Sequence, residues 1–314
     1  MSSNPQTINL SDWIGRTAVL NEPIDLALAQ RIAISLAEGD TAQHLEAGAP
    51  LPPLWHWCFF QTPAVAADLS LDGHPRRGGF LPPVSLPRRM WAGGSLRFHK
   101  PLPIAATILR ESRIRSIEEK EGRSGPLVFV SIDHHYTANG TLLLEERQDL
   151  VFREQAKKVA EGAESLPPST ALEDGGALNN AVASKEILPS EVALFRYSAL
   201  TFNSHRIHYD RDYAKNVEGY AGLVVHGPLL ATQLCEFAES LAESLAESLV
   251  EEETAQLQSF DFRGQQATLD LGPYFLQAEQ VKRSEGLVEI DLRVVNHAGA
   301  QSMKAQAVFR LIKA

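Results

Sequence analysis

Two stretches of alternating apolar and polar residues predict β-strands that bury one face. A period of two is the spacing at which side chains alternate across a sheet. A predicted turn follows each stretch, at Asn139-Gly140 and at His297-Ala298-Gly299. Asn-Gly is typical of a tight hairpin because both of its central residues need a positive φ. The apolar positions are Val128, Val130 and Ile132 in the first stretch and Val288, Ile290, Leu292 and Val294 in the second.

The two stretches belong to a longer repeat. Ser95-Leu96-Arg97-Phe98 opens the first copy, and Ser259-Phe260-Asp261-Phe262 opens the second. Each copy closes on Val-Phe-Arg, at 151–153 and at 308–310, so the opening and closing motifs are 56 and 49 residues apart. Similar strands at similar spacing predict two copies of one structural unit.

A helix is predicted before each copy. Pro23 is followed by an apolar stripe with a spacing of four residues, which is typical of a helix that starts near a proline. A longer helix is predicted from Pro228 to Glu253, with Glu239, Glu243 and Glu247 on a solvated face. The apolar stripes are Ile24, Leu28, Ile32 and Leu36 in the first helix and Leu230, Leu234, Phe237, Leu241, Leu245 and Leu249 in the second.

The order of these elements predicts an α+β fold with two similar domains. Residues 155–187 contain Pro-Pro, Gly-Gly and Asn-Asn pairs and weak periodicity, so we interpret them as a linker between domains at 1–154 and 188–314. A helix followed by a meander of long antiparallel strands, twice, suggests a sheet wrapped around a long central helix in each domain. This architecture is a tandem, or double, hot dog.

Composition and charge limit the partners that we expect. The 314 residues carry a formal net charge of −10, and no basic tail or helix is present, which argues against nucleic acid or a membrane surface as a partner. The two cysteines are too few for a disulfide framework, and the N-terminal residues do not resemble a secretory signal. We therefore expect a soluble cytoplasmic protein.

Residues with catalytic potential are densest between Asn203 and Asp210, followed by His226-Gly227-Pro228 at the predicted start of the long helix. A helix N-terminus presents free N–H groups, and the Gly227 N–H could meet a carbonyl oxygen that gains negative charge. His208 is suited to moving a proton, because an unperturbed imidazole has a pKa of about 6.5. A purely structural role for these residues stays open. His205 and His208 lack a well-placed third ligand, although Asp210 or His226 could be recruited, so we predict no metal.

These residues resemble the signature of MaoC-like hydratases and dehydratases and, more closely, the mesaconyl-C4-CoA (3-methylfumaryl-CoA) and itaconyl-CoA hydratases. The resemblance runs through 195–210, 219–220 and 224–228, and in the first half through 51–57, 79–84 and 86–94. It implies a double hot dog, an acyl-CoA substrate, and reversible addition of water to an α,β-unsaturated thioester without a metal or redox cofactor. The first half has only Asp40-Thr41-Ala42-Gln43-His44 in a comparable place, so it is expected to be a degenerate copy that shapes the substrate tunnel.

The resemblance also suggests a role for each candidate residue. His208 matches the catalytic histidine, and Gly227, next to His226, matches the glycine whose N–H polarises the thioester carbonyl. In the broader pattern Asp-x-Asn-Pro-x-His, the place of the aspartate holds Asn203, which can hold a water but cannot accept its proton. We expect His208 to move the proton with Asn203 positioning the water, and His205 is the main alternative.

The expected substrate is a branched C5-dicarboxyl thioester, which is hydrated to citramalyl-CoA. Its free carboxylate calls for a guanidinium, and the candidates are Arg206, Arg88 and Arg89. Three alternatives remain: a 3-hydroxyacyl dehydratase acting on acyl carrier protein or CoA thioesters, a thioesterase, and a non-catalytic acyl-CoA binding module. A homodimer is plausible but not required, because one chain already pairs two hot dogs.

Overall fold

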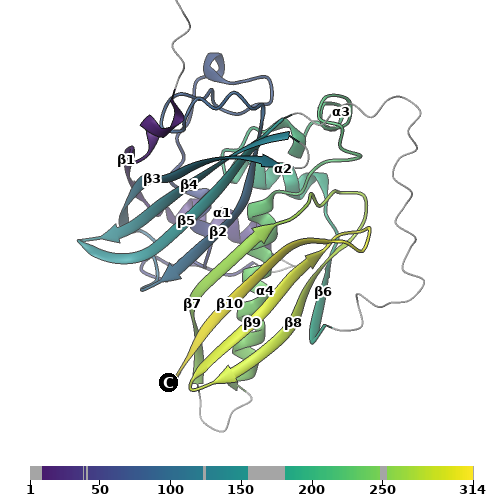
Figure 1. Cartoon of the computed structure of the whole chain (residues 1–314). Coiled ribbons are helices and arrows are strands. Elements are labelled where there is room, and N and C mark those ends of the chain that lie inside the picture. Colours follow the sequence, from purple (N-terminus) through teal and green to yellow (C-terminus); the bar gives the residue numbers. More distant parts are fainter. Residues whose placement is uncertain are drawn as a thin grey trace, which may run out of the picture.

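Strands from both halves of the chain form one continuous antiparallel sheet in the computed structural model, which describes residues 9–37, 39, 42–122, 125–154, 181–247 and 253–313 (Figure 1). The strands of the first half are β1 (Thr17–Pro23), β2 (Arg88–Phe98), β3 (Thr107–Gly122), β4 (Gly125–Ala138) and β5 (Thr141–Arg153). Those of the second half are β6 (Ala183–Ile187), β7 (Glu253–Gly264), β8 (Tyr274–Ser284), β9 (Leu287–Val295) and β10 (Gln301–Lys313). Across the sheet the order is β1-β3-β4-β5-β2-β7-β10-β9-β8-β6.

The strand order confirms the predicted repeat. From the centre of the sheet outward, the first half runs β2-β5-β4-β3-β1 and the second half runs β7-β10-β9-β8-β6, which is the same connectivity. The two predicted turns also occupy equivalent places, between β4 and β5 and between β9 and β10. Asn139 and Gly140 have φ values of 48° and 77°, and Gly299 has 76°, as tight turns require.

The two halves join where the opening motifs of the repeat meet. β2 and β7 pair antiparallel, with Leu96 opposite Phe260 and Gly94 opposite Phe262. The backbones approach so closely here that a Cβ atom on Gly93 would lie 2.5 Å from the carbonyl oxygen of Phe262. The hydrogen-bonded ladder therefore continues from one domain into the other.

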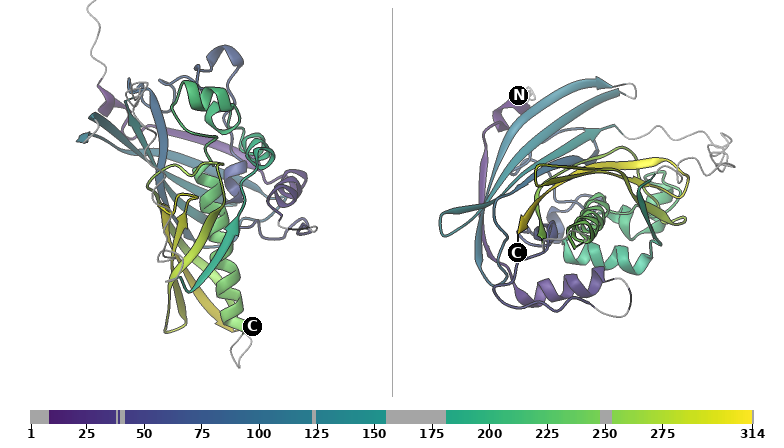
Figure 2. Two further views of the ribbon diagram at one scale, coloured as in Figure 1. Left: turned by 90° about the vertical axis from the view of Figure 1, so that its right-hand side faces the viewer. Right: turned by 90° about the horizontal axis from the view of Figure 1, so that it is seen from below.

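A long helix lies in the concave face of the second half-sheet, as predicted (Figure 2). The helices are α1 (Leu26–Leu36), α2 (Glu191–Leu200), α3 (Arg211–Asn216) and α4 (Gly227–Glu247), and the shorter 3-10 turns are η1 (Leu10–Trp13), η2 (Trp55–Cys58), η3 (Ala66–Asp68) and η4 (Arg206–His208). α4 contacts β7, β8, β9 and β10, and it buries Leu230, Leu234 and Phe237 against them. Residues 248–252 of the predicted helix lie outside the described residues, and the prediction is wrong at Glu253, its last residue, which is the first residue of β7.

The first half keeps the sheet but holds a different structure over it. α1 is confirmed as a helix, capped by the Asp25 side chain, yet it has only 11 residues and packs against α2 and η2. The turn η2 packs on the first half-sheet, with the ring of Trp57 4.8 Å from that of Trp91 and its Nε1–H donating to Glu146. The double hot dog therefore has its long central helix in the second copy.

The predicted linker is wrong at its C-terminal end. Its last five residues form strand β6, which pairs with β8 at the edge of the sheet. A five-residue edge strand with alternating exposure has too few apolar residues to be recognised from the pattern alone. Residues 155–180 of the predicted linker lie outside the described residues. Within the described part of the chain, no helix is long and apolar enough to cross a membrane.

Candidate active site

A cavity of about 1210 Å³ is lined by residues from both halves of the chain. From the second half it is reached by Asn203, His205 and His208, which lie between α2 and α3, and by Gly227 at the start of α4. From the first half it is reached by His74 and Arg89. The structure therefore brings together most of the residues predicted from the sequence and adds residues from the first half.

His208 is held in one tautomer by the segment that leads into α4. Its Nδ1 lies 2.7 Å from the carbonyl oxygen of Val224, which can only accept, so Nδ1 carries the hydrogen. Nε2 is then the nitrogen that can accept a hydrogen bond from a ligand in the cavity. Burial lowers the pKa of His208 to about 4, which keeps the ring neutral and available as a base at neutral pH.

The N-terminus of α4 presents the Gly227 backbone to the cavity. The first N–H groups of a helix have no partner within the helix, and a Cβ atom on Gly227 would meet nothing within 4 Å. A carbonyl oxygen can therefore approach this end of the helix. His226, which the sequence places with Gly227 at the thioester carbonyl, does not line the cavity: its side chain is fully buried and stacks on the ring of His208, with ring centroids 3.7 Å apart.

Asn203 and His205 lie beside His208 in the same loop. The Oδ1 atom of Asn203 accepts a hydrogen bond of 3.0 Å from the backbone N–H of His205. The ring of His205 is 5.5 Å from that of His208, measured between centroids. Burial, together with the charges of His74 and His208, lowers the pKa of His205 to about 2. A neutral His205 therefore stays possible as the alternative base.

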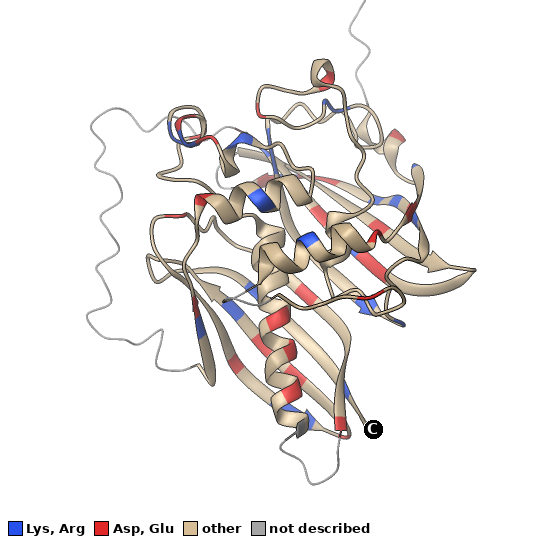
Figure 3. Ribbon diagram, turned by 180° about the vertical axis from the view of Figure 1, so that it is seen from behind, with Lys and Arg blue, Asp and Glu red and all other residues tan. Residues whose placement is uncertain are grey.

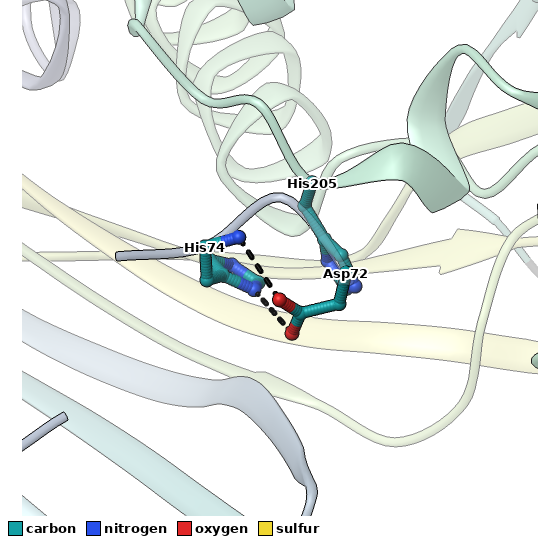
Figure 4. Close-up of side chains that lie close together, drawn as sticks. All are labelled: Asp72, His74 and His205. Carbon is teal, nitrogen blue, oxygen red and sulfur yellow. Dashed lines mark hydrogen bonds and ion pairs between the residues drawn. The ribbon is translucent and has the colours of Figure 1, made fainter. Parts of the chain in front are cut away.

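Asp72 and His74 are the site residues that the sequence did not reveal (Figure 4). Asp72 Oδ2 lies 3.0 Å from His74 Nδ1, and Asp72 Oδ1 accepts a 3.0 Å hydrogen bond from the backbone N–H of His74. The ring of His74 packs 4.1 Å from that of His205. Possible ligand atoms of Asp72, His74 and His205 all lie within 4.8 Å of one another, so within the described part of the chain this is the cluster that could hold a metal ion.

The three candidate arginines have different surroundings. Arg206 forms an ion pair of 2.7 Å with Asp210, and Arg88 forms one of 2.9 Å with Glu218. Neither of them lines the cavity, so the structure argues against both as carboxylate ligands. Arg89 lines the cavity, and its guanidinium has no hydrogen-bond or ion-pair partner among the described residues. Burial and then the charge of Arg77 lower the pKa of Arg89 to about 10, so it remains a cation at neutral pH.

Comparisons with known proteins relate this chain to one enzyme family. A family model described as hydroxyacyl-thioester dehydratase type 2 matches residues 54–270. The mesaconyl-C(4)-CoA hydratase of Chloroflexus aurantiacus is 42% identical over 294 residues, which cover 93% of this chain and 95% of that protein. A mitochondrial hydroxyacyl-thioester dehydratase type 2 of Schizosaccharomyces pombe is 28% identical over 217 residues, covering 61% of this chain and 68% of that protein.

Solved structures show the same fold at low sequence identity. A MaoC-like dehydratase is similar with a TM-score of 0.65 and 12% identity, over 96% of this chain and 99% of that chain. A Mycobacterium tuberculosis protein described as having a double hotdog fold is similar with a TM-score of 0.53 and 13% identity, over 95% of this chain and 96% of that chain. The chain therefore has the predicted double hot dog fold and belongs to the hydroxyacyl-thioester dehydratase type 2 family of hydro-lyases.

Proposed function

We propose that the protein is an acyl-CoA hydratase that adds water reversibly to mesaconyl-C4-CoA and forms citramalyl-CoA. The observation that carries this proposal is a single cavity lined by the Gly227 backbone, by a neutral His208 and by an arginine without a partner within the described residues. The similarity to the mesaconyl-C(4)-CoA hydratase supports the reaction class and the substrate. Itaconyl-CoA, a related C5-dicarboxyl thioester, is the second candidate substrate.

The Gly227 N–H binds the thioester oxygen in this mechanism. Addition of water to the β-carbon moves the electrons of the double bond towards that oxygen, which gains negative charge as an enolate. The N-terminus of α4 stabilises this charge through its unpaired N–H groups and its dipole. A single donor of this kind lowers the barrier by roughly 3 kcal/mol in other enzymes.

His208 moves the proton. Its Nε2 accepts a proton from the water as the oxygen bonds to the β-carbon, and the same proton then passes to the α-carbon of the enolate. The Val224 carbonyl keeps the hydrogen of Nδ1 in place throughout, so that Nε2 is the nitrogen that reacts. Each step uses groups of this chain alone, and the absence of a metal or redox cofactor stays an expectation from the family resemblance.

Arg89 provides the selectivity for a dicarboxyl substrate. In mesaconyl-C4-CoA the free carboxylate is attached to the β-carbon, so its cation must lie close to the catalytic histidines. Burial and then the charge of Arg89 lower the pKa of His74, which means that the guanidinium acts directly on this group of rings. Arg89 is partly buried and positive, as the partner of a substrate carboxylate should be.

The test follows the absorbance of the enoyl thioester with mesaconyl-C4-CoA, itaconyl-CoA and crotonyl-CoA, and product masses are checked for the gain of one water. Wild-type protein is expected to hydrate mesaconyl-C4-CoA, and His208→Ala is expected to lose activity by about 10²- to 10⁴-fold, the usual contribution of a general base. His135→Ala is the matched control, because His135 lies on the exposed face of β4, opposite the face that buries His134. Turnover of crotonyl-CoA alone would contradict the dicarboxyl substrate.

A 3-hydroxyacyl-thioester dehydratase is the second candidate, because the family model and the yeast relative carry that description. The same cavity could run the reaction in the reverse direction, from hydroxyacyl to enoyl thioester. Faster conversion of 3-hydroxybutyryl thioesters of CoA or acyl carrier protein than of citramalyl-CoA would favour this function. Tight binding of all these thioesters without a change in mass would favour a non-catalytic binding module.

A further inference from the structure

Asn203 binds a water differently from the aspartate that the family pattern has at this place. Its Oδ1 atom already accepts the backbone N–H of His205, so one of its two acceptor sites is used within the loop. The NH₂ group of Asn203 can donate a hydrogen bond to the oxygen of a water, but it cannot accept one of the hydrogens of that water. An aspartate at the same place would accept.

The attacking water therefore needs an additional acceptor. It has two hydrogens, of which His208 Nε2 accepts one. A polar hydrogen that is left without a partner in a buried site is unfavourable, and the water would then be poorly oriented for attack. A side chain on another element of the cavity can provide this second acceptor.

His74 has the required acceptor in a fixed place. Its Nδ1 lies 3.0 Å from a carboxylate oxygen of Asp72, which only accepts, so Nδ1 carries the hydrogen and Nε2 is the acceptor. His74 lines the same cavity as His208 and packs against the ring of His205, which in turn contacts the ring of His208. The ring nitrogens of His205 have no hydrogen-bond partner among the described residues, so nothing fixes its tautomer in the same way.

The loop that carries this pair is attached to the catalytic loop. The Arg206 backbone N–H donates a 2.9 Å hydrogen bond to the carbonyl oxygen of Asp72, and the Ser204 hydroxyl donates to the carbonyl oxygen of Gly73. A Cβ atom on Gly73 would lie 1.8 Å from the carbonyl oxygen of Ser204, so only glycine fits at this crossing. His74 is therefore held in position relative to the residues around His208.

We propose that His74 is a further catalytic residue, whose Nε2 accepts the second hydrogen of the attacking water, and that Asp72 is the positioning residue that fixes its tautomer. The inference rests on the proposed hydration activity and deepens it. A histidine backed by a carboxylate from the first half then performs the role that the family pattern gives to the aspartate at the place of Asn203. The first half thus contributes to the chemistry as well as to the shape of the cavity.

The first experiment compares the hydration kinetics of wild type, His74→Ala, His74→Gln and Asp72→Asn with mesaconyl-C4-CoA. We expect kcat to fall about 100-fold in His74→Ala and about tenfold in Asp72→Asn, with KM changed by less than about threefold, because the water and not the acyl group loses its partner. His135→Ala is the control for loss of a histidine. Thermal unfolding of each variant identifies any that do not fold, and His74→Gln keeps most of the side-chain volume.

The decisive experiment asks whether an aspartate at position 203 can rescue the loss of His74. In the double variant His74→Ala/Asn203→Asp a carboxylate can again accept the second hydrogen, so we expect at least about tenfold more activity than in His74→Ala. Asn203→Asp alone is the baseline for this comparison. A purely structural role of His74 predicts no rescue, and that result would overturn the proposal.

Other outcomes separate this inference from the proposed function. Full activity of His74→Ala, with loss of activity in His205→Ala, would overturn the role of His74 and assign the water to His205. Loss of wild-type activity on treatment with EDTA, restored by zinc ions alone, would mean that the cluster binds a metal, and would also overturn it. Absence of hydration by the wild-type protein would overturn the proposed function itself, and the role of His74 with it.

Discussion

Arg89 is the residue on which the choice of acyl group is expected to depend. We predict that Arg89→Met lowers kcat/KM for mesaconyl-C4-CoA by about 10- to 100-fold, the effect of removing one charge-assisted hydrogen bond to a carboxylate. The rate with crotonyl-CoA, which has no free carboxylate, is expected to stay the same. The measurement is kcat/KM for the two substrates with wild type and variant.

Arg31→Met is a suitable control for this substitution, because Arg31 is exposed on α1 and does not line the cavity. A loss of the same size with both substrates would show that Arg89 supports the fold of the site and not the recognition of a carboxylate. Arg89→Lys should recover part of the activity, since it keeps the charge but not the two parallel donors.

The residues of the site were predictable where they follow one another in the chain. Asn203, His208 and Gly227 were assigned to one site from their closeness in the chain together with the family resemblance, and all three line the cavity. Asp72 and His74 come from a loop more than a hundred residues earlier, and no local pattern links them to His205. The role suggested for Arg206 failed for a reason visible in the sequence, since Asp210 stands four residues later and forms its ion pair.

At the scale of the elements, α4 carries a glutamate, Glu239, whose charged form is disfavoured by burial. The sequence pattern predicts Glu239 on a solvated face, and Figure 3 shows acidic positions along this helix, but the Glu239 side chain is only partly exposed. Burial, followed by the charges of Glu236 and Glu243, raises its pKa from 4.5 to about 8. The prediction of a solvated face is wrong for Glu239 and correct for the exposed Glu243, whereas the side chain of Glu247 is outside the described part of the structure.

Glu239→Gln is therefore expected to stabilise the protein in a pH-dependent way. An acid with a higher pKa in the folded than in the unfolded protein binds its proton more tightly when folded, so wild-type stability falls between pH 4.5 and about 8. The slope due to this group is at most about 1.4 kcal/mol per pH unit. Thermal unfolding should show the variant more stable than wild type at pH 8 and nearly equal to it at pH 5.

The exposed Glu111 on β3 provides the control, and Glu111→Gln is expected to change stability little at either pH. An equal difference between Glu239→Gln and wild type at pH 5 and at pH 8 would contradict an origin in the titration of Glu239.

Periodicity predicted the long elements and missed the features that depend on tertiary contacts. Strands β4 and β9 and helix α4 have enough residues to show a period of two or of about four, and each was found. Strand β6 has five residues and exists because β8 offers it an edge to pair with. Helix α1 packs against α2 and does not lie over the centre of the first half-sheet. Turn η2 occupies that space, so the position of α1 depends on a tertiary contact.

At the scale of the whole molecule, the two hot dogs form a single unit in structure and in chemistry. The sheet is continuous through β2 and β7, and the cavity takes residues from both halves. Trp55 of the first half donates a 2.8 Å hydrogen bond to Glu236 on α4 of the second. A protein with a single hot dog pairs two of them by forming a dimer, and here both are present within one chain. A homodimer of whole chains stays a prediction.

This arrangement predicts that the junction of the two halves limits the stability of both. In Gly93→Ala the new Cβ atom would lie 2.5 Å from the carbonyl oxygen of Phe262, which belongs to the backbone of β7 and cannot rotate away. We expect a loss of about 1–3 kcal/mol, as for other overpacked sites, and a melting temperature lower by a few degrees. Gly79→Ala is the matched control, because a Cβ atom there meets nothing within 4 Å and its φ is not positive. Since the halves share one ladder of hydrogen bonds, calorimetry should show one unfolding transition that shifts as a whole. A melting temperature equal to that of Gly79→Ala, or two separate transitions of which one moves, would mean that the halves fold independently and that the junction only aligns them.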